Sequence, residues 1–97
     1  MYEIEFTPKA KGDLRTLRKG DQRLVVDGVE EQLEREPIQE TRNRKRLRPN
    51  QLAEWEVRID RFRVFYDVDD EAETVKVVAV GYKKGNRLII RDKEFDL

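Results

Sequence analysis

The sequence predicts an α+β fold: an N-terminal strand and a helical hairpin, followed by a mainly antiparallel, twisted sheet of three to four strands, in the order β-α-α-β-β-β. Apolar residues fall at helical spacing between residues 8 and 36, whereas from residue 55 onward they alternate with charged residues, as in strands. A length of 97 residues is typical of one small domain, so we expect residues 1–97 to form a single domain.

The first part of the chain should form one strand and two helices. Residues 2–6 alternate between apolar and charged side chains, which is typical of a half-buried strand. Thr7-Pro8 predicts a helix start, because threonine caps helices and proline fits the first helical position. Gly20-Asp21 should break this helix, and Asp21 should cap a second one, which Pro37 ends near residues 35–36.

The second part of the chain should form the sheet. Residues 37–52 show neither the helical nor the strand spacing of apolar residues, and they are predicted to form a long loop. A loop of this length is unusual in a small domain unless it has a function. Three strands are then predicted, at residues 55–59, 62–68 and 74–82. Asp60-Arg61 leaves room only for a tight turn between the first two. Leu88–Ile90 is expected to add a short final strand, with Phe95 or Leu97 docked on the core.

The apolar face of the sheet should pack against the helices. The candidate core residues are Leu14, Leu17, Val25, Val29, Leu33, Trp55, Val57, Phe62, Val64, Val75 and Val77. Alternation then directs Arg58, Arg63 and Phe65 to the opposite, exposed face of the sheet.

Several chemistries are excluded by residue types that the sequence lacks. It has no cysteine and no histidine, and it also lacks serine. Thiolate nucleophiles are therefore excluded, and the commonest general base and metal ligand are missing. Catalysis would depend on Arg, Lys, Tyr, Thr or carboxylates, and we expect no cofactor and no metal.

No segment resembles a secretory signal or a membrane span, so a cytoplasmic protein without membrane contact is expected.

The net charge is zero, but the charges are unevenly distributed. Residues 1–41 carry seven Lys/Arg and ten Asp/Glu, residues 42–66 carry eight and three, and residues 67–97 carry six and eight. Five cations without an intervening acid lie in one short segment, at Arg42, Arg44, Lys45, Arg46 and Arg48. We interpret this segment as an RNA contact that binds phosphates without reading sequence. The alternatives are a solvated loop or a docking strip for an acidic protein partner.

The order of several segments resembles a known family. The landmarks are Tyr2-x-Ile4-x-Phe6-Thr7, a helical hairpin ending in proline, Trp55-Glu56-Val57-Arg58-Ile59, Arg61-Phe62-Arg63-Val64-Phe65-Tyr66, and a valine-rich strand before Gly81-Tyr82-Lys83. In this order they are similar to the RelE/ParE superfamily of bacterial toxins, and the resemblance covers residues 2–87.

The resemblance implies that the chain is a RelE/ParE-like domain, the toxin of a type II toxin-antitoxin system. In the RelE branch, the implied activity is metal-independent cleavage of mRNA in the ribosomal A site, by in-line attack of a ribose 2′-OH. The implied partners are a cognate antitoxin, the ribosome and mRNA. In the ParE branch, the implied activity is inhibition of DNA gyrase without chemistry. A partner-binding module of the same fold, without activity, is a third alternative.

The resemblance also implies catalytic positions at Arg63, Arg58 and Lys83. Arg63 matches the arginine of the family's aromatic-Arg-hydrophobic-aromatic-Tyr strand, and a guanidinium suits the charge of a phosphodiester transition state. The alternative for Arg63 and Arg58 is a surface ion pair with an acid on a neighbouring strand. Lys84 and Arg87 are expected to join the RNA contacts.

Two positions depart from the RelE pattern, and one aromatic residue has two interpretations. Glu56 stands where a second lysine is common, and Ile89 stands where a tyrosine is common. Glu56 is expected to orient an arginine, with a role as general base for the 2′-OH as the alternative. Tyr82 either stacks on a base or caps the core. Both the RelE-like and the ParE-like activities therefore stay open.

Overall fold

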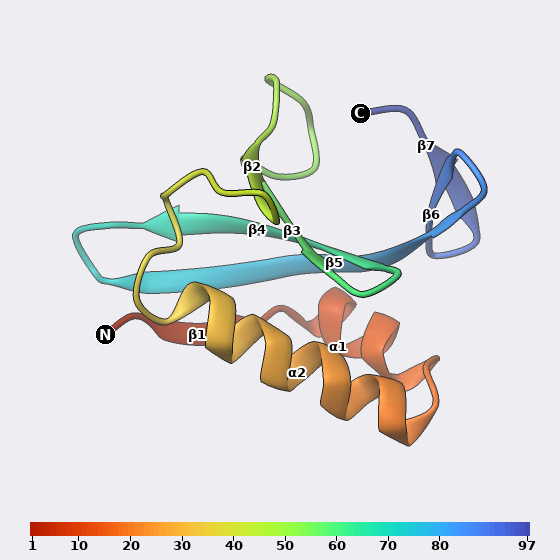
Figure 1. Ribbon diagram of the computed structural model, residues 1–97, viewed down its shortest axis with the longest axis horizontal. Coiled ribbons are helices and arrows are strands. Elements are labelled where there is room, and N and C mark those ends of the chain that lie inside the picture. The colour runs from red at the N-terminus through yellow and green to blue at the C-terminus, as the bar shows by residue number, and fades with distance from the viewer.

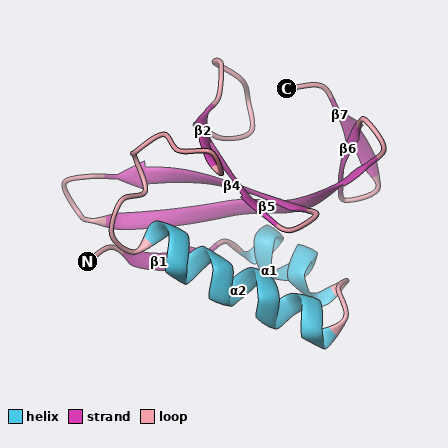
Figure 2. Cartoon of the chain, viewed as in Figure 1, coloured by secondary structure: helices cyan, strands magenta, loops and turns pink.

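The computed structural model describes residues 1–97 and confirms the α+β class (Figures 1 and 2). The elements are β1 (Glu3–Phe6), α1 (Pro8–Arg15), α2 (Lys19–Leu33), β2 (Arg44–Arg46), β3 (Trp55–Ile59), β4 (Phe62–Asp69), β5 (Thr74–Lys84), β6 (Arg87–Ile90) and β7 (Lys93–Phe95). Both helices lie on one face of the sheet, while the loop at β2 and the β6–β7 hairpin rise on the other (Figure 1). No helix has the length and apolar character needed to cross a membrane.

The sheet has seven strands, more than the three to four predicted. Its order is β2-β3-β4-β5-β6-β7, and all these neighbours pair antiparallel. β1 pairs parallel with the first half of β5. It lies along the same edge of β5 with which β6 pairs at the other end of that strand. The strands that were not predicted are β2, which forms inside the predicted loop, and β7, whereas β6 is the short final strand expected at Leu88–Ile90.

The helical hairpin begins as predicted but turns earlier. The hydroxyl of Thr7 accepts a hydrogen bond of 3.2 Å from the Ala10 N–H, as expected of an N-cap. The break, however, comes at residues 16–18, and Gly20 lies inside α2. Asp21 does not cap this helix, because its carboxylate is held by Arg61 from the β3–β4 turn at 2.8 Å.

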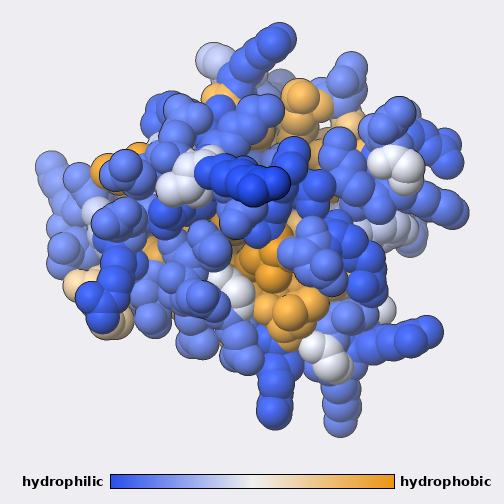
Figure 3. All heavy atoms as spheres, in the orientation of Figure 1, coloured by the Kyte–Doolittle hydropathy of each residue, from blue (hydrophilic) through white to orange (hydrophobic).

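The main core lies between the helices and the sheet, as predicted. The predicted core residues of α2 and the sheet are buried, and Leu14 and Leu17 pack at the edge of the cluster. Gly28 permits a close approach, since a Cβ at this position would lie 2.7 Å from a methyl group of Ile59. The surface is mostly hydrophilic, and apolar atoms emerge mainly where the helices meet the sheet (Figure 3).

A second, smaller core covers part of the opposite face, and it corrects one prediction. Phe65, which was expected to be exposed beside Arg63, is fully buried. It packs with Ala53, Ala79 and two side chains of β6, namely Leu88 and Ile90. The reason is the β6–β7 hairpin, which folds back over the sheet and removes this area from water. The part of the face around Arg63 stays open.

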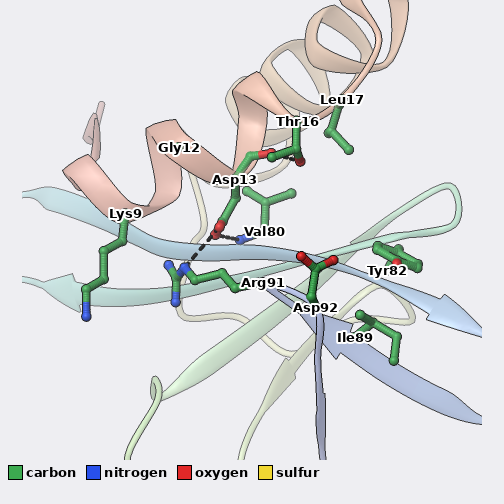
Figure 4. Close-up of a pocket in the computed structure, with 11 residues that line it drawn as sticks. Lys9, Gly12, Asp13, Thr16, Leu17, Val80, Tyr82, Ile89, Arg91 and Asp92 are labelled. Atoms are coloured by element: carbon green, nitrogen blue, oxygen red, sulfur yellow. Dashed lines mark hydrogen bonds and ion pairs between the residues drawn. The ribbon is translucent and has the colours of Figure 1, made fainter.

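A gap in the pairing of β5 is closed by side chains. β1 pairs with β5 as far as Val77, and β6 begins to pair at Tyr82, so the edge between them lacks a partner strand. The Val80 N–H donates a 3.0 Å hydrogen bond to the Asp13 carboxylate, and Arg91 donates one of 2.9 Å to the Val78 carbonyl. Arg91 and Asp13 also form an ion pair at 2.9 Å, which joins α1 to the C-terminal hairpin (Figure 4).

Candidate functional site

A small cavity of about 170 Å³ lies on the sheet face away from the helices. Four neighbouring strands each contribute one cation to its wall: Lys45 from β2, Arg58 from β3, Arg63 from β4 and Lys83 from β5. Arg58 and Arg63 are direct cross-strand partners, so their side chains share one face of the sheet. The three residues expected to be catalytic are therefore brought together, and Lys45 joins them.

The cations of the cavity are not neutralised by ion pairs. None of the four lies within 4.0 Å of a carboxylate, although Glu56 and Asp96 also line the cavity. Arg63 instead donates to the backbone carbonyls of Asp60 and Phe62, at 3.3 and 3.1 Å. The expected alternative of a surface ion pair is therefore absent, and the positive charge is available to an anion.

Arg63 occupies an environment that disfavours its own charge. Burial lowers the pKa of its guanidinium, the neighbouring charge of Arg58 lowers it further, and Glu56 acts in the opposite direction. The Nε–H of Arg63 is buried without a hydrogen-bond partner. A phosphate oxyanion in the cavity would offset the loss of hydration and the repulsion by Arg58.

The segment at residues 42–48 is divided by the alternation of β2. Lys45 pairs with Glu56 and faces the cavity, whereas Arg44 and Arg46 face the helix side. Arg44 is only 9% exposed, and its guanidinium donates to the backbone carbonyls of Gln32 and Glu36 at the end of α2. Arg44 was predicted to contact RNA, but here it holds the loop against the helix and cannot reach a nucleic acid.

The other predicted RNA contacts lie outside the cavity. Arg42 and Arg48 are exposed on either side of β2, and Lys84 and Arg87 are exposed at the β5–β6 turn. Arg87 lies 3.5 Å from Glu94, and Arg46 lies over the Trp55 ring at 5.7 Å. Tyr82, which is 36% exposed, alternates with Lys83 and faces the helix side, so it is not part of this cavity.

Part of the cavity wall comes from residues that were not predicted to contribute. Asn86 lines it from the β5–β6 turn, and Phe95, Asp96 and Leu97 line it from the end of β7 and the residues that follow. The signal that was overlooked is Arg91-Asp92, a polar pair directly after the apolar segment Leu88–Ile90. Both residues adopt a positive φ, of 52° and 64°, as two-residue hairpin turns require. Such a turn directs β7 back over the sheet and toward the cations.

Comparison with known proteins agrees with the family resemblance of the sequence. Residues 4–87 match the family model described as the ParE toxin of the type II toxin-antitoxin system parDE. No curated protein sequence matches the chain. Among solved structures, the RelBE2 toxin-antitoxin complex of Mycobacterium tuberculosis contains a chain that is 32% identical, with a TM-score of 0.73. The match covers 84% of this chain and 98% of that chain.

Two more distant structures share the fold. A chain in the archaeal RelE–RelB complex of Pyrococcus horikoshii is 20% identical, with a TM-score of 0.64, over 81% of this chain and 91% of that one. A mutant of the Escherichia coli toxin RelE, bound to a peptide of its antitoxin, is 21% identical, with a TM-score of 0.57, over 87% and 85%. From the family match and the 32% identical structure, we conclude that the chain belongs to the RelE/ParE superfamily of type II toxin-antitoxin toxins.

Proposed function

We propose that this protein stops translation in the cytoplasm by cutting mRNA on the ribosome, through metal-independent attack of a ribose 2′-OH. The observation that supports this best is the cavity to which four adjacent strands each contribute an unpaired cation. A phosphodiester gains negative charge as it passes through its pentavalent transition state. Cations held in advance on a rigid sheet stabilise that charge without reorganising.

The chemical roles follow from the bonds that change. The 2′-oxygen forms a bond to phosphorus, the bond to the 5′-oxygen breaks, and the 5′-oxygen takes up a proton. We assign phosphate stabilisation to Arg63 with Arg58, and protonation of the leaving oxygen to Lys83. Glu56 favours the charged form of Arg63, and it is the strand carboxylate of the cavity that can accept the proton of the 2′-OH.

The partners would bind the same face. The strand that carries the reacting nucleotides would be held by phosphate contacts to Lys45, Arg42, Arg48, Lys84 and Arg87, all of which are exposed. The structural relatives were solved as toxin-antitoxin complexes. We propose that a cognate antitoxin covers the cavity. Its acidic side chains would neutralise the cations, and the same contact would block access to the site.

A second candidate function is inhibition of DNA gyrase without chemistry. The match to a ParE toxin model favours it, and so does the absence of a tyrosine at Ile89. In this case the cavity would bind protein or DNA, and no RNA ends would be produced.

Induction of the protein in growing cells distinguishes the two functions. The endoribonuclease predicts that protein synthesis stops within minutes and that new mRNA 5′ ends appear at codon-linked positions. The gyrase inhibitor predicts DNA damage and filamentation first, without new RNA ends. Induction of Arg63→Ala should produce neither new 5′ ends nor growth arrest, whereas Arg35→Ala, an exposed arginine at the end of α2, should behave as wild type.

A further inference from the structure

Residues 93–97, the C-terminal segment, narrow the candidate site. Phe95, Asp96 and Leu97 of this segment line the cavity that holds the four cations. After β7 the chain turns back over the sheet, toward the loop that follows β2 (Figure 1). Leu47, the first residue of that loop, lines the same cavity. The cations therefore lie in a space that is bordered by the loop after β2 and by the C-terminal segment.

The cavity is too small for the substrate that its charges suit. Its volume is about 170 Å³. Pockets that enclose drug-sized ligands, a class that includes a nucleotide, measure roughly 300–1,000 Å³. A cleavable phosphodiester carries a nucleoside on each side of its phosphate. The cavity thus has room for the phosphate group but not for its two neighbours, so part of the wall must move before RNA can enter.

The C-terminal segment also brings a negative charge to the cations. Asp96 and the strand residue Glu56 are the two carboxylates of the cavity wall, against four cations. Asp96 lies more than 4.0 Å from each of these cations, so it attracts them without forming a close ion pair. A phosphate of RNA would be drawn to the same place. The carboxylate of Asp96 and the phosphate therefore compete for one group of charges.

The C-terminal segment is held weakly. β7 pairs with β6 along one edge, through three residue pairs, and its other edge has no partner strand. The ion pair of Arg87 and Glu94, at 3.5 Å, joins two side chains that are both more than half exposed, so it contributes little. Within the segment Phe95 is partly buried, and the other four residues are exposed. A segment with so few buried contacts separates from the sheet at low cost.

The residues just before this segment are fixed, which defines where it can bend. Leu88 and Ile90 of β6 are buried in the second core. Arg91 is tied to α1 by its 2.9 Å ion pair with Asp13. Movement of the C-terminal segment would therefore pivot at Asp92, in the turn between β6 and β7, and would leave β6 in place.

We propose that the C-terminal segment is a lid on the candidate site. With the lid closed, Asp96 faces the cations and the cavity admits a small anion. With the lid open, the cavity admits RNA. This inference rests on the proposed function, because it concerns how the substrate of that reaction enters the same site.

A reversible tether tests the lid directly. The chain has no cysteine, so two introduced thiols can be bridged specifically. In Leu47→Cys/Leu97→Cys both thiols line the one small cavity, and a short bis-methanethiosulfonate reagent should bridge them in the free protein. Dithiothreitol releases this bridge. Each single-cysteine variant, treated with the same reagent, is the control, because it carries the reagent but cannot be bridged within the chain.

The bridged protein should discriminate by size. It should bind inorganic phosphate as wild type does, which the NMR signal of the Arg63 Nε–H reports. A 2′-O-methyl RNA hexamer, which cannot be cut, should bind at least about 100-fold more weakly, since a lid that is open less than about 1% of the time lowers the apparent affinity in proportion. Cleavage of mRNA on programmed ribosomes should fall by a similar factor, and dithiothreitol should restore both activities.

A substitution in the lid tests the role of its charge. Asp96→Asn should bind the RNA hexamer about fivefold more tightly than wild type, because it removes the carboxylate that competes with phosphate. Asp92→Asn is the matched control, since it neutralises an exposed acid of the same hairpin that lines a different cavity. It should bind the hexamer as wild type does.

The outcomes separate the lid from the proposed function. Thiols that cannot be bridged, or a bridged protein that binds the hexamer as wild type, would overturn the lid. Equal affinities of Asp96→Asn and Asp92→Asn would overturn the competition by Asp96. If wild type never cuts mRNA but the bridge excludes the hexamer and spares phosphate, the lid stands and the nuclease proposal fails. If wild type cuts and the bridged protein cuts equally fast, only the lid fails.

Discussion

Tyr66 is a buried polar side chain that fastens the sheet to the segment after α2. Its hydroxyl donates a 2.7 Å hydrogen bond to the Pro37 carbonyl, and its ring stacks on Trp55 with centroids 6.2 Å apart. Burial raises the pKa of Tyr66 above its ordinary value of 10.0, and the charge of Arg44 acts in the opposite direction. The folded protein therefore keeps this proton at a pH where the unfolded chain has lost it.

The raised pKa predicts that the free energy of unfolding falls as the pH rises above about 10, and that below this pH the contribution of Tyr66 is fully present. Tyr66→Phe should cost about 1 kcal/mol at pH 7, because Pro37 loses its donor. The substitution should also make the free energy of unfolding fall less steeply at high pH. Urea denaturation at pH 7 and at several values between 9 and 11 measures both effects. Tyr82→Phe, at the exposed tyrosine of β5, is the control, and an equally steep decrease in Tyr66→Phe would exclude this explanation.

At the level of single residues, alternation along strands was the reliable guide. It placed Arg58 and Arg63 on one face, because neighbouring strands in register repeat the same period, whereas Lys83 was assigned from the family resemblance. It could not identify Arg44 as buried, since the partners of that guanidinium are backbone carbonyls at the end of a helix. Such a contact depends on how the loop folds back, and no local pattern encodes it.

At the level of elements, the ion pair of Asp13 and Arg91 joins two segments that are distant in the sequence. Asp13 is nearly fully buried in α1, while Arg91 lies in the turn of the β6–β7 hairpin. The other side of this hairpin forms a wall of the candidate site. The position of that wall therefore depends on an interaction that lies on the helix side of the sheet.

Two substitutions at Asp13 separate its roles. Asp13→Ala should destabilise the fold by about 2–3 kcal/mol, because the buried Val80 N–H loses its acceptor as well as the ion pair. Asp13→Asn keeps an acceptor and loses only an ion pair with a partly exposed arginine, so it should cost about 1 kcal/mol. Urea denaturation gives both values, and amide exchange at Val80 should accelerate only in Asp13→Ala. Equal costs would mean that the hydrogen bond contributes little.

The helices and central strands could be predicted because their apolar periodicities are long and regular. The break between the two helices was predicted too far along the chain, because Gly20 and Asp21 are residues typical of a break. In the structure both lie in α2, and the Asp21 carboxylate pairs with Arg61. The C-terminal hairpin was predicted only as one short strand. Its strands are four and three residues long, so their pattern is too short to define a register, and tertiary packing on Phe65 defines it instead.

At the level of the whole molecule, a neutral chain presents a group of unpaired cations around a cavity on one face of its sheet. The acids that balance them lie in the last turns of α2, in β1 and in the β4–β5 turn. Net charge therefore says little about the partners of this protein, whereas the distribution of charge says much. The family match defines a toxin fold, and the four cations of the cavity support cleavage of RNA as its activity.

The most direct test of this account is the rate of mRNA cleavage on programmed ribosomes by purified wild type, Arg63→Ala and the control Arg35→Ala. Because Arg63 would stabilise the transition state from an open face of the sheet, Arg63→Ala should cut about 10²–10³ times more slowly while keeping the circular dichroism spectrum of wild type. Arg35→Ala should cut at the wild-type rate. A folded Arg63→Ala protein that cuts as fast as wild type would contradict the assignment of the site, and a wild-type protein that arrests growth without cutting mRNA would contradict the proposed function itself.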